Sequence, residues 1–155
     1  MRVLTICQPF AELIVADANT LPPGQTPKRV ENRSWPTSHR GSLAIHAGKS
    51  TAWFENEEWS TSEYPVPMGA IVGVVDLLDC LHIDRITGRD PDIVTRFPWI
   101  TSHEHAEGRF CWVLGNVRRL TTPIAWNGSQ GLWFVPDKVL EGKPLIEVEA
   151  AYVAR

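Results

Sequence analysis

The sequence predicts an α+β fold in which about six short strands form a small β-barrel covered by two or three short helices. The chain has 12 prolines and 11 glycines among 155 residues. They fall between short apolar runs, which indicates many turns and a β-rich architecture. A chain of this length is expected to form one domain, residues 1–155, and to bury most of the surface that its unfolded state exposes.

The first part of the chain predicts a strand, a helix and a loop. Residues 2–6 are mostly apolar and predict the first strand. Pro9 suits the first turn of a helix, where its missing N–H costs nothing. Because the apolar residues that follow have helical spacing, we expect a short helix over 9–18. Residues 19–27 are rich in proline and predict a loop.

The middle of the chain predicts two strands with a helix between them. Residues 41–47 alternate and predict a strand that ends at Gly48. Ser50 is suited to cap a short helix that runs to residue 59, helped by acidic residues near its start. Residues 69–80 are the longest apolar run and predict a central strand. Within it, Gly73 is expected to allow a close approach or a bulge.

The last part predicts an irregular region followed by strands. Residues 84–108 are polar, with a turn expected at Asp90 and Pro91 and a turn of helix at 102–107. The expected strands and extended segments are 109–114, 118–126 and a closing strand over 145–153, in which Ile146, Val148, Ala150 and Tyr152 share one face.

Residues 28–36 bring together three cations, a carboxylate, an amide and an indole. In an extended backbone the side chains alternate, so Arg29, Glu31 and Arg33 would share one face. A core strand would not carry this density of charge. The pattern therefore predicts the wall of a polar pocket.

The charge of the chain limits the classes of function. A formal net charge of −3 argues against a protein that coats a phosphate backbone without specificity, because such binding needs many cations. The cations nevertheless gather over residues 28–49, which predicts a local basic face on an acidic body. They are Lys28, Arg29, Arg33, Arg40 and Lys49.

The three cysteines predict free thiols rather than a structural framework. Cys7, Cys80 and Cys111 are odd in number, widely spaced and flanked by apolar residues, which is typical of a reducing cytoplasm. The spacing of cysteines and histidines fits no standard zinc site, so we expect no metal and no cofactor. No apolar run approaches the ~20 residues that cross a bilayer. We expect a cytoplasmic protein that does not contact a membrane.

The tryptophans divide into two groups. Trp35 lies in the charged stretch, and Trp126 and Trp133 flank a glycine-rich turn. Aromatic rings beside glycines and cations suit the stacking of a planar base, although a packing role stays open for each. The others lie in apolar surroundings and are expected in the core; they are Trp53, Trp59, Trp99 and Trp112.

The group formed by Lys28, Glu31 and Arg33 has two interpretations. An exposed salt-bridge cluster would contribute little to stability. A carboxylate held between cations would instead be oriented and ionised. It could accept from an exocyclic amine while the cations donate to carbonyl or phosphate oxygens.

These motifs resemble the ASCH domain family, a branch of the PUA-like superfamily. The matching KxxExR core is Lys28, Glu31 and Arg33, although Gly24 is displaced from the place of the glycine in the family's usual GxKxxExR. The other matching segments are 4–11, 31–37, 40–41, 45–49, 111–114 and 131–133. The resemblance implies a barrel of five or six mostly antiparallel strands with flanking helices, and a cleft lined by the KxxExR residues.

The resemblance also implies function. The family is thought to bind RNA or other nucleic acid, and some small relatives are amidohydrolases of N4-acylated cytidines. Those relatives use a lysine, a threonine three residues further on and a separate acid. Glu31 occupies the threonine position here, so catalysis would need Glu31 or Glu107 as base and Lys28 as electrostatic stabiliser.

Our leading hypothesis is a module that binds nucleic acid (RNA or single-stranded DNA) or a nucleotide in a basic and aromatic cleft. Glu31 would read an amine edge while Trp35 or Trp133 stacks on the base. The expected ligand-binding residues are Lys28, Glu31, Arg33, Trp35, Arg40, His46, Lys49 and Trp133. The alternatives are a small amidohydrolase of a modified cytidine nucleoside and a protein-interaction domain that uses the acidic region 55–63.

Overall fold

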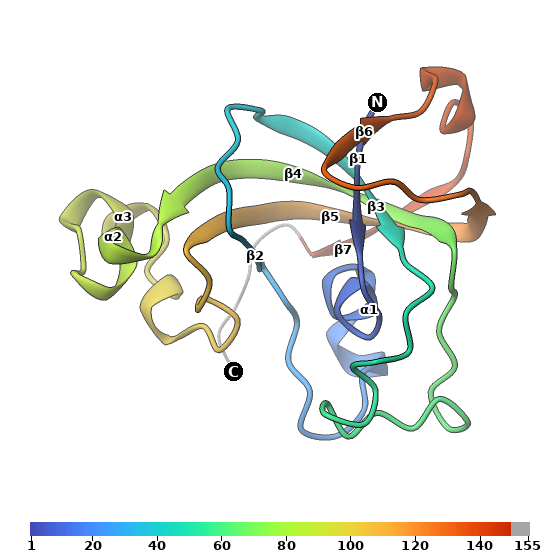
Figure 1. The fold of residues 1–155 in the computed structure, drawn as a ribbon, viewed down its shortest axis with the longest axis horizontal. Coiled ribbons are helices and arrows are strands. Elements are labelled where there is room, and N and C mark those ends of the chain that lie inside the picture. The colour runs from blue at the N-terminus through green and yellow to red at the C-terminus, as the bar shows by residue number, and fades with distance from the viewer. Residues whose placement is uncertain (150–155) are drawn as a thin grey trace.

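A computed structural model describes residues 1–149, which are organised by one seven-stranded mixed sheet (Figure 1). The strands are β1 Arg2–Ile6, β2 Val30–Arg33, β3 Gly41–Ala47, β4 Ala70–His82, β5 Phe110–Ala125, β6 Leu132–Phe134 and β7 Leu145–Glu149. The α-helices are α1 Phe10–Val15, α2 Ile83–Thr87 and α3 Pro91–Arg96. Single 3₁₀ turns are η1 Ala18–Thr20, η2 Ile100–Ser102 and η3 Asp137–Val139.

The long strands β4 and β5 form the centre of the sheet. The order is β2-β5-β4-β3-β1-β6, and β7 pairs with β5 as well. β1 and β3 run parallel, and the other described pairs run antiparallel. β2 pairs with the first part of β5 and β7 with a later part. The sheet curls into a half-barrel with short helices around it, which confirms the predicted α+β, PUA-like class (Figure 1).

The main core lies between α1 and the sheet. Ile14 and Val15 of α1 pack with Ile45 of β3, and all three are fully buried. Burial of one such side chain contributes roughly 1.5–3 kcal/mol, so this contact fixes α1 against the strands. A second cluster joins α2, α3 and η2 to β2 and β5, and includes Val30 and Ile93. The second cluster thereby holds β2 on its apolar side, through Val30.

α1 is shorter than the predicted helix over 9–18. Pro9 lies at the N-cap rather than inside the first turn, and the chain becomes extended again at Ala16. The buried side chain of Gln8 accepts from the N–H of Glu12 at 2.9 Å. This contact satisfies one of the free N–H groups at the start of the helix.

The predicted helix over 50–59 is wrong, because the segment forms successive turns. Glu58 has a φ of 53°, in the left-handed region that interrupts a helix. Trp59 is buried, and its indole N–H donates to the carbonyl of Tyr64 at 2.9 Å. Anchoring this one large side chain decides the path of the segment against its local helix signals.

The region 84–108 contains two helices. The predicted cap at Asp90 is confirmed, because its carboxylate accepts from the N–H of Asp92 at 3.0 Å and α3 follows. α2 was not predicted, because its cap is the imidazole of His82, which accepts from the N–H of Asp84 at 3.1 Å. The helical turn expected at 102–107 is replaced by η2, which ends at Ser102.

The predicted strands are largely confirmed, with one merger. The two segments expected at 109–114 and 118–126 form the single strand β5. A Cβ on Gly73 would lie 2.6 Å from the carbonyl oxygen of Arg118 and 2.9 Å from Val15, and the β4–β5 register shifts there. The expected close approach at this glycine is therefore confirmed. The closing strand is present over 145–149, and its predicted continuation, residues 150–153, lies outside the described residues.

Within the described part of the chain, no helix has the length and apolar character needed to cross a membrane. The three cysteines are free, as predicted, and Cys111 is buried.

Candidate functional site

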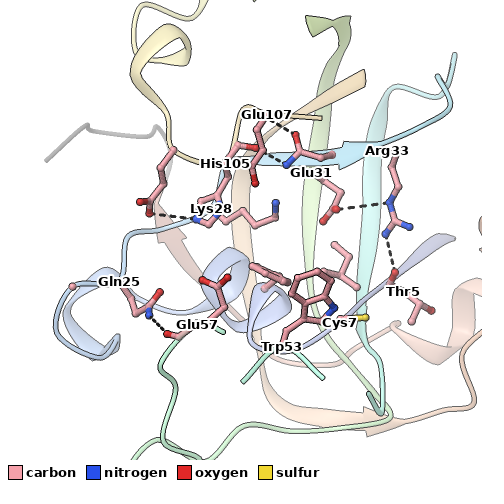
Figure 2. A pocket seen from close by; sticks show the side chains of 15 residues that line it. Thr5, Cys7, Gln25, Lys28, Glu31, Arg33, Trp53, Glu57, His105 and Glu107 are labelled. Atoms are coloured by element: carbon pink, nitrogen blue, oxygen red, sulfur yellow. Dashed lines mark hydrogen bonds and ion pairs between the residues drawn. The ribbon is translucent and has the colours of Figure 1, made fainter. Parts of the chain in front are cut away.

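A cavity of about 620 Å³ opens beside β2, next to the start of α1 and the end of β1 (Figure 2). We call it the Glu31 cavity. Three loops complete its wall, around residues 24–28, 53–57 and 104–107. The side chains that line it are Thr5, Ile6, Cys7, Phe10, Gln25, Lys28, Glu31, Asn32, Arg33, Trp53, Glu57, Glu104, His105 and Glu107, with Gly24.

β2 places its residues by strand alternation. Val30 packs into the core, whereas Glu31 and Arg33 face the cavity. Asn32 holds the neighbouring loop: its amide nitrogen donates to the carbonyl of His105, and its oxygen accepts from the N–H of Gly108 at 2.8 Å. The predicted polar wall is therefore present over 31–33.

Glu31 is a buried carboxylate in the wall of the cavity. It is 8% exposed, and its Oε1 lies 3.8 Å from Nε of Arg33. Its other oxygen, Oε2, is buried without a hydrogen-bond partner among the described residues. An unsatisfied buried acceptor is costly, more so when it is charged. The carboxylate is thus prepared to accept from a donor that enters the cavity.

Two cations accompany this carboxylate. Arg33 donates through Nη2 to the carbonyl of Thr5 at 2.9 Å, which ties β2 to β1. Lys28 is 4% exposed, and its Nζ lies 5.6 Å from the ring centroid of Phe10, a cation–π contact. Figure 2 shows its ammonium in the space between His105 and Glu31. Lys28 and Glu31 therefore contribute a donor and an acceptor to the same cavity.

Arg29 lies outside the cavity lining, unlike Glu31 and Arg33. It is 1% exposed, and its guanidinium donates to the carbonyls of Ile14 at 3.0 Å and Lys28 at 2.9 Å. The N–H of Leu114 donates to the carbonyl of Arg29 at 2.9 Å, so backbone pairing with β5 continues to residue 29, and the guanidinium reaches α1. Arg29 braces α1 against the chain that leads into β2.

Two histidines behind Lys28 are neutral at pH 7. Burial, followed by the charge of Lys28, lowers the pKa of His105 to about 4, and the Glu104 carboxylate opposes this shift. Burial also lowers the pKa of His103 to about 3, with help from His105, Lys28 and Arg29. The imidazole of His103 accepts from the backbone N–H of Arg29 at 3.0 Å. His105 therefore adds a polar but uncharged group to the cavity.

Aromatic rings form one wall of the cavity. Phe10 and Trp53 contact edge to face, with ring centroids 5.7 Å apart. Trp53 is 43% exposed, although the sequence predicts it in the core. Gln25 donates to the carbonyl of Glu57 at 2.8 Å, which joins the two loops beside these rings. An exposed indole at a cavity is able to stack on a planar ligand.

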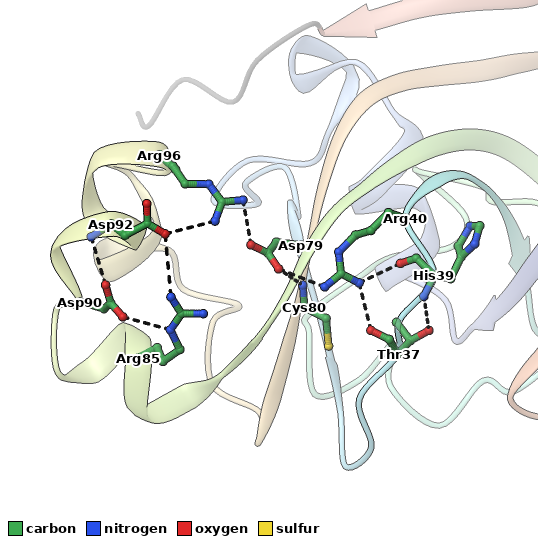
Figure 3. A network of polar contacts seen from close by, with 9 residues as sticks. All are labelled: Thr37, His39, Arg40, Asp79, Cys80, Arg85, Asp90, Asp92 and Arg96. Atoms are coloured by element: carbon green, nitrogen blue, oxygen red, sulfur yellow. Dashed lines mark hydrogen bonds and ion pairs between the residues drawn. The ribbon is translucent and has the colours of Figure 1, made fainter.

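Five of the eight predicted ligand-binding residues lie outside the cavity lining, and Trp35 and Arg40 are two of them. Trp35 packs edge to face on the buried Trp112, with centroids 4.9 Å apart. Arg40 pairs with Asp79 at 3.1 Å in a surface network that continues to Arg96 (Figure 3). The structure places these side chains in a packing contact and an ion-pair network.

The other three lie in β3, just after β3 and in β6; they are His46, Lys49 and Trp133. His46 is 1% exposed; its ring lies 3.2 Å from the Thr5 hydroxyl and 2.8 Å from the Trp126 carbonyl. Trp133 donates to the same Thr5 hydroxyl at 3.1 Å. Lys49 lines a separate open hollow with Trp126. Thr5 is the link between this group and the cavity, because its carbonyl accepts from Arg33.

The cavity is more acidic than the sequence predicts. Its lining holds two cations, Lys28 and Arg33, and four carboxylates, a formal charge of −2. The acids from outside the motif come from loops: Glu57, Glu104 and Glu107. Only Glu107 was considered from the sequence, since long-range loop contacts leave no local pattern. Among the described residues, no cluster of His, Cys, Asp and Glu is suited to hold a metal ion.

The half-barrel with its flanking short helices has an ASCH/PUA-like fold, and comparison with known proteins supports this. The crystal structure of ASCH from Zymomonas mobilis matches over 90% of each chain, with a TM-score of 0.52 and 13% identity, which shows a shared fold. No family model matches the chain. The resemblance to the ASCH family that the motifs indicate is confirmed.

Two curated relatives match in sequence. Activating signal cointegrator 1 of Mus musculus is 29% identical over 151 residues, and its counterpart of Homo sapiens is 28% identical over 151 residues. Each alignment covers 90% of this chain but 23% of the relative. The chain thus corresponds to less than a quarter of the length of these proteins.

Proposed function

We propose that this chain is a nucleobase-binding module, which takes a base of a nucleic acid, a nucleotide or a nucleoside into the Glu31 cavity. The observation that carries this proposal is the buried, unpartnered Oε2 of Glu31. An ionised carboxylate only accepts hydrogen bonds, so a donor group of a ligand that enters the cavity would satisfy it. The exocyclic amines and ring N–H groups of bases are such donors.

Other residues of the cavity are able to bind the remaining groups of a base, its hydrogen-bond acceptors and its planar ring. Lys28 supplies a donor for a ring nitrogen or a carbonyl oxygen, the acceptors that accompany the amine on a base edge. Trp53 offers a partly exposed ring for stacking, which is worth about 1–3 kcal/mol per base. The cavity volume of about 620 Å³ is within the range typical of small-molecule sites.

The test is a binding measurement with nucleosides, nucleotides and short single-stranded RNA and DNA at low salt. We expect Glu31→Gln, Lys28→Met and Trp53→Ala each to weaken binding by about tenfold or more, since each removes one recognition element. Glu141→Gln is the matched control, because Glu141 is exposed and does not line the cavity. Unchanged binding in all three cavity variants would contradict the proposal.

A second candidate is an amidohydrolase of an acylated amino base. It is favoured by one observation, that Lys28, Glu31 and Glu107 line the same cavity. A carboxylate would take a proton from water, the water would add to the amide carbon, and Lys28 would stabilise the oxyanion before the amine leaves with a proton. Incubation with N4-acetylcytidine separates the two functions, because a binding module releases no cytidine and no acetate.

A further inference from the structure

We infer that the Glu31 cavity selects phosphate-free nucleosides over nucleotides and over continuous strands. This inference rests on the proposed function and concerns the charge at the mouth of the same site. The inner part of the cavity is balanced, because the buried Lys28 and Glu31 have opposite charges. The charge of the residues at the mouth of the cavity therefore decides whether a base can enter with or without an attached phosphate.

The mouth of the cavity is acidic. The side chain of Glu104 is 55% exposed, Glu107 is exposed and Glu57 is half-buried, and they come from two different loops (Figure 2). Apart from Lys28, the cation in the lining is Arg33, whose Nη2 donates to the Thr5 carbonyl and whose Nε is buried without a hydrogen-bond partner among the described residues. His105 adds no positive charge at pH 7, because its pKa is about 4. Three carboxylates therefore outnumber one cation outside the buried pair of Lys28 and Glu31.

The geometry of a nucleoside directs its phosphate to this mouth. The amine-bearing edge of a base points away from the bond to the sugar. A base whose amine reaches the buried Glu31 must therefore leave its sugar at the exposed end of the cavity. A phosphate on that sugar carries a charge of about −1.5 to −2 at pH 7. It would lie among Glu57, Glu104 and Glu107 and be repelled by them.

Paired ligands test this inference. Cytidine, adenosine and guanosine are compared with their 5′-monophosphates by calorimetry at low and high salt. We expect at least one nucleoside to bind about tenfold tighter than its monophosphate at low salt, and the ratio to shrink at high salt because salt screens exposed charges. If each nucleoside that binds is matched or exceeded in affinity by its monophosphate, the inference is overturned while base binding remains intact. Failure of every nucleoside, monophosphate and oligonucleotide to bind would instead overturn the proposed function.

Charge variants identify the source of the selection. Glu104→Gln is expected to reduce the nucleoside-to-monophosphate ratio, and the double variant Glu104→Gln/Glu107→Gln to reduce it further, to about threefold or less. Glu141→Gln removes the same charge outside the cavity lining and should leave the ratio unchanged. A ratio that stays the same in the double variant would show that the acidic mouth is not the cause and would contradict the inference.

Discussion

Asn32 and Gly108 are in such close contact that the site depends on the absence of a side chain at residue 108. The amide oxygen of Asn32 accepts from the N–H of Gly108 at 2.8 Å, and a Cβ on Gly108 would lie 2.3 Å from the Cβ of Asn32. Since Asn32 also binds the carbonyl of His105, this contact fixes the loop that brings His105 and Glu107 to the cavity. Asn32 of β2 therefore positions this part of the cavity wall.

The first prediction concerns this contact. Gly108→Ala should lower the free energy of unfolding by about 1–3 kcal/mol and weaken ligand binding, because the new methyl group must displace β2 or the loop. Urea denaturation and calorimetry measure the two effects. Gly48→Ala is the control, since a Cβ there would have only ordinary contacts, at 3.4 Å or more. Equal stability of the two variants would contradict the prediction.

The second prediction is a loss of stability in acid. The pKa values of His103 and His105, about 3 and about 4, lie below the ordinary value of 6.5 that the unfolded chain should show. The unfolded state therefore binds more protons between these values, and stability falls as pH decreases. The contribution is fully present above about pH 6.5 and is lost progressively toward pH 4 and then pH 3. It amounts to a few kcal/mol, on the order of 1.4 kcal/mol for each pKa unit.

Denaturant unfolding at a series of pH values measures this dependence. His105→Gln should reduce the slope between pH 6.5 and pH 4, because the variant has no imidazole to protonate at this site. His39→Gln, at a histidine outside the cavity lining, is the control and should retain the slope. A slope unaffected by His105→Gln would show that other groups cause the acid sensitivity.

The third prediction concerns the ion-pair network of Figure 3, which joins α3 to β4 and to the segment before β3. Asp79 accepts from Arg40 at 3.1 Å and from the N–H of Cys80 at 2.8 Å, and it pairs with Arg96 at 2.8 Å. Its side chain is 15% exposed, whereas that of Asp92 in the same network is 63% exposed. Asp79→Ala should cost about 1–3 kcal/mol, since two cations and an N–H lose their partner.

The more exposed member of this network provides the comparison. Asp92→Ala should cost less than about 1 kcal/mol, because exposed ion pairs are screened by water and salt. Thermal or urea unfolding of both variants measures the difference. If the two substitutions cost the same, the partial burial of Asp79 has no energetic role.

The parts of the fold that could be predicted from the sequence are those determined by residues close to one another in the chain. The apolar run over 69–80 predicts β4 because a buried strand needs such residues, and Asp90 predicts the start of α3 because a cap acts on the next N–H groups. Glu31 and Arg33 were expected on one face from strand alternation alone, and both line the cavity. Each of these inferences uses residues within one element.

The parts that could not be predicted depend on contacts between distant segments. Arg29 can be buried because its guanidinium donates to the carbonyls of Ile14 and Lys28. Ile14 belongs to α1, 15 residues earlier in the chain, so no local pattern indicates this contact. Trp53 lines the cavity because a turn, rather than a helix, carries it past Phe10. Glu104 and His105 reach the site only through the loop that Asn32 holds. The acidic character of the cavity was missed for the same reason.

The last prediction distinguishes the three thiols and reports on the site without a known ligand. Cys111 is fully buried, and burial raises the pKa of its thiol to about 11, so it should not react in the folded protein at mildly alkaline pH. Cys7 and Cys80 are partly exposed and should react, and Cys7 lines the Glu31 cavity. A ligand that fills the cavity should slow labelling of Cys7 while leaving Cys80 unaffected. Mass spectrometry of peptides after brief labelling measures each rate, and equal protection of Cys7 and Cys80 would indicate binding elsewhere or a global change in stability.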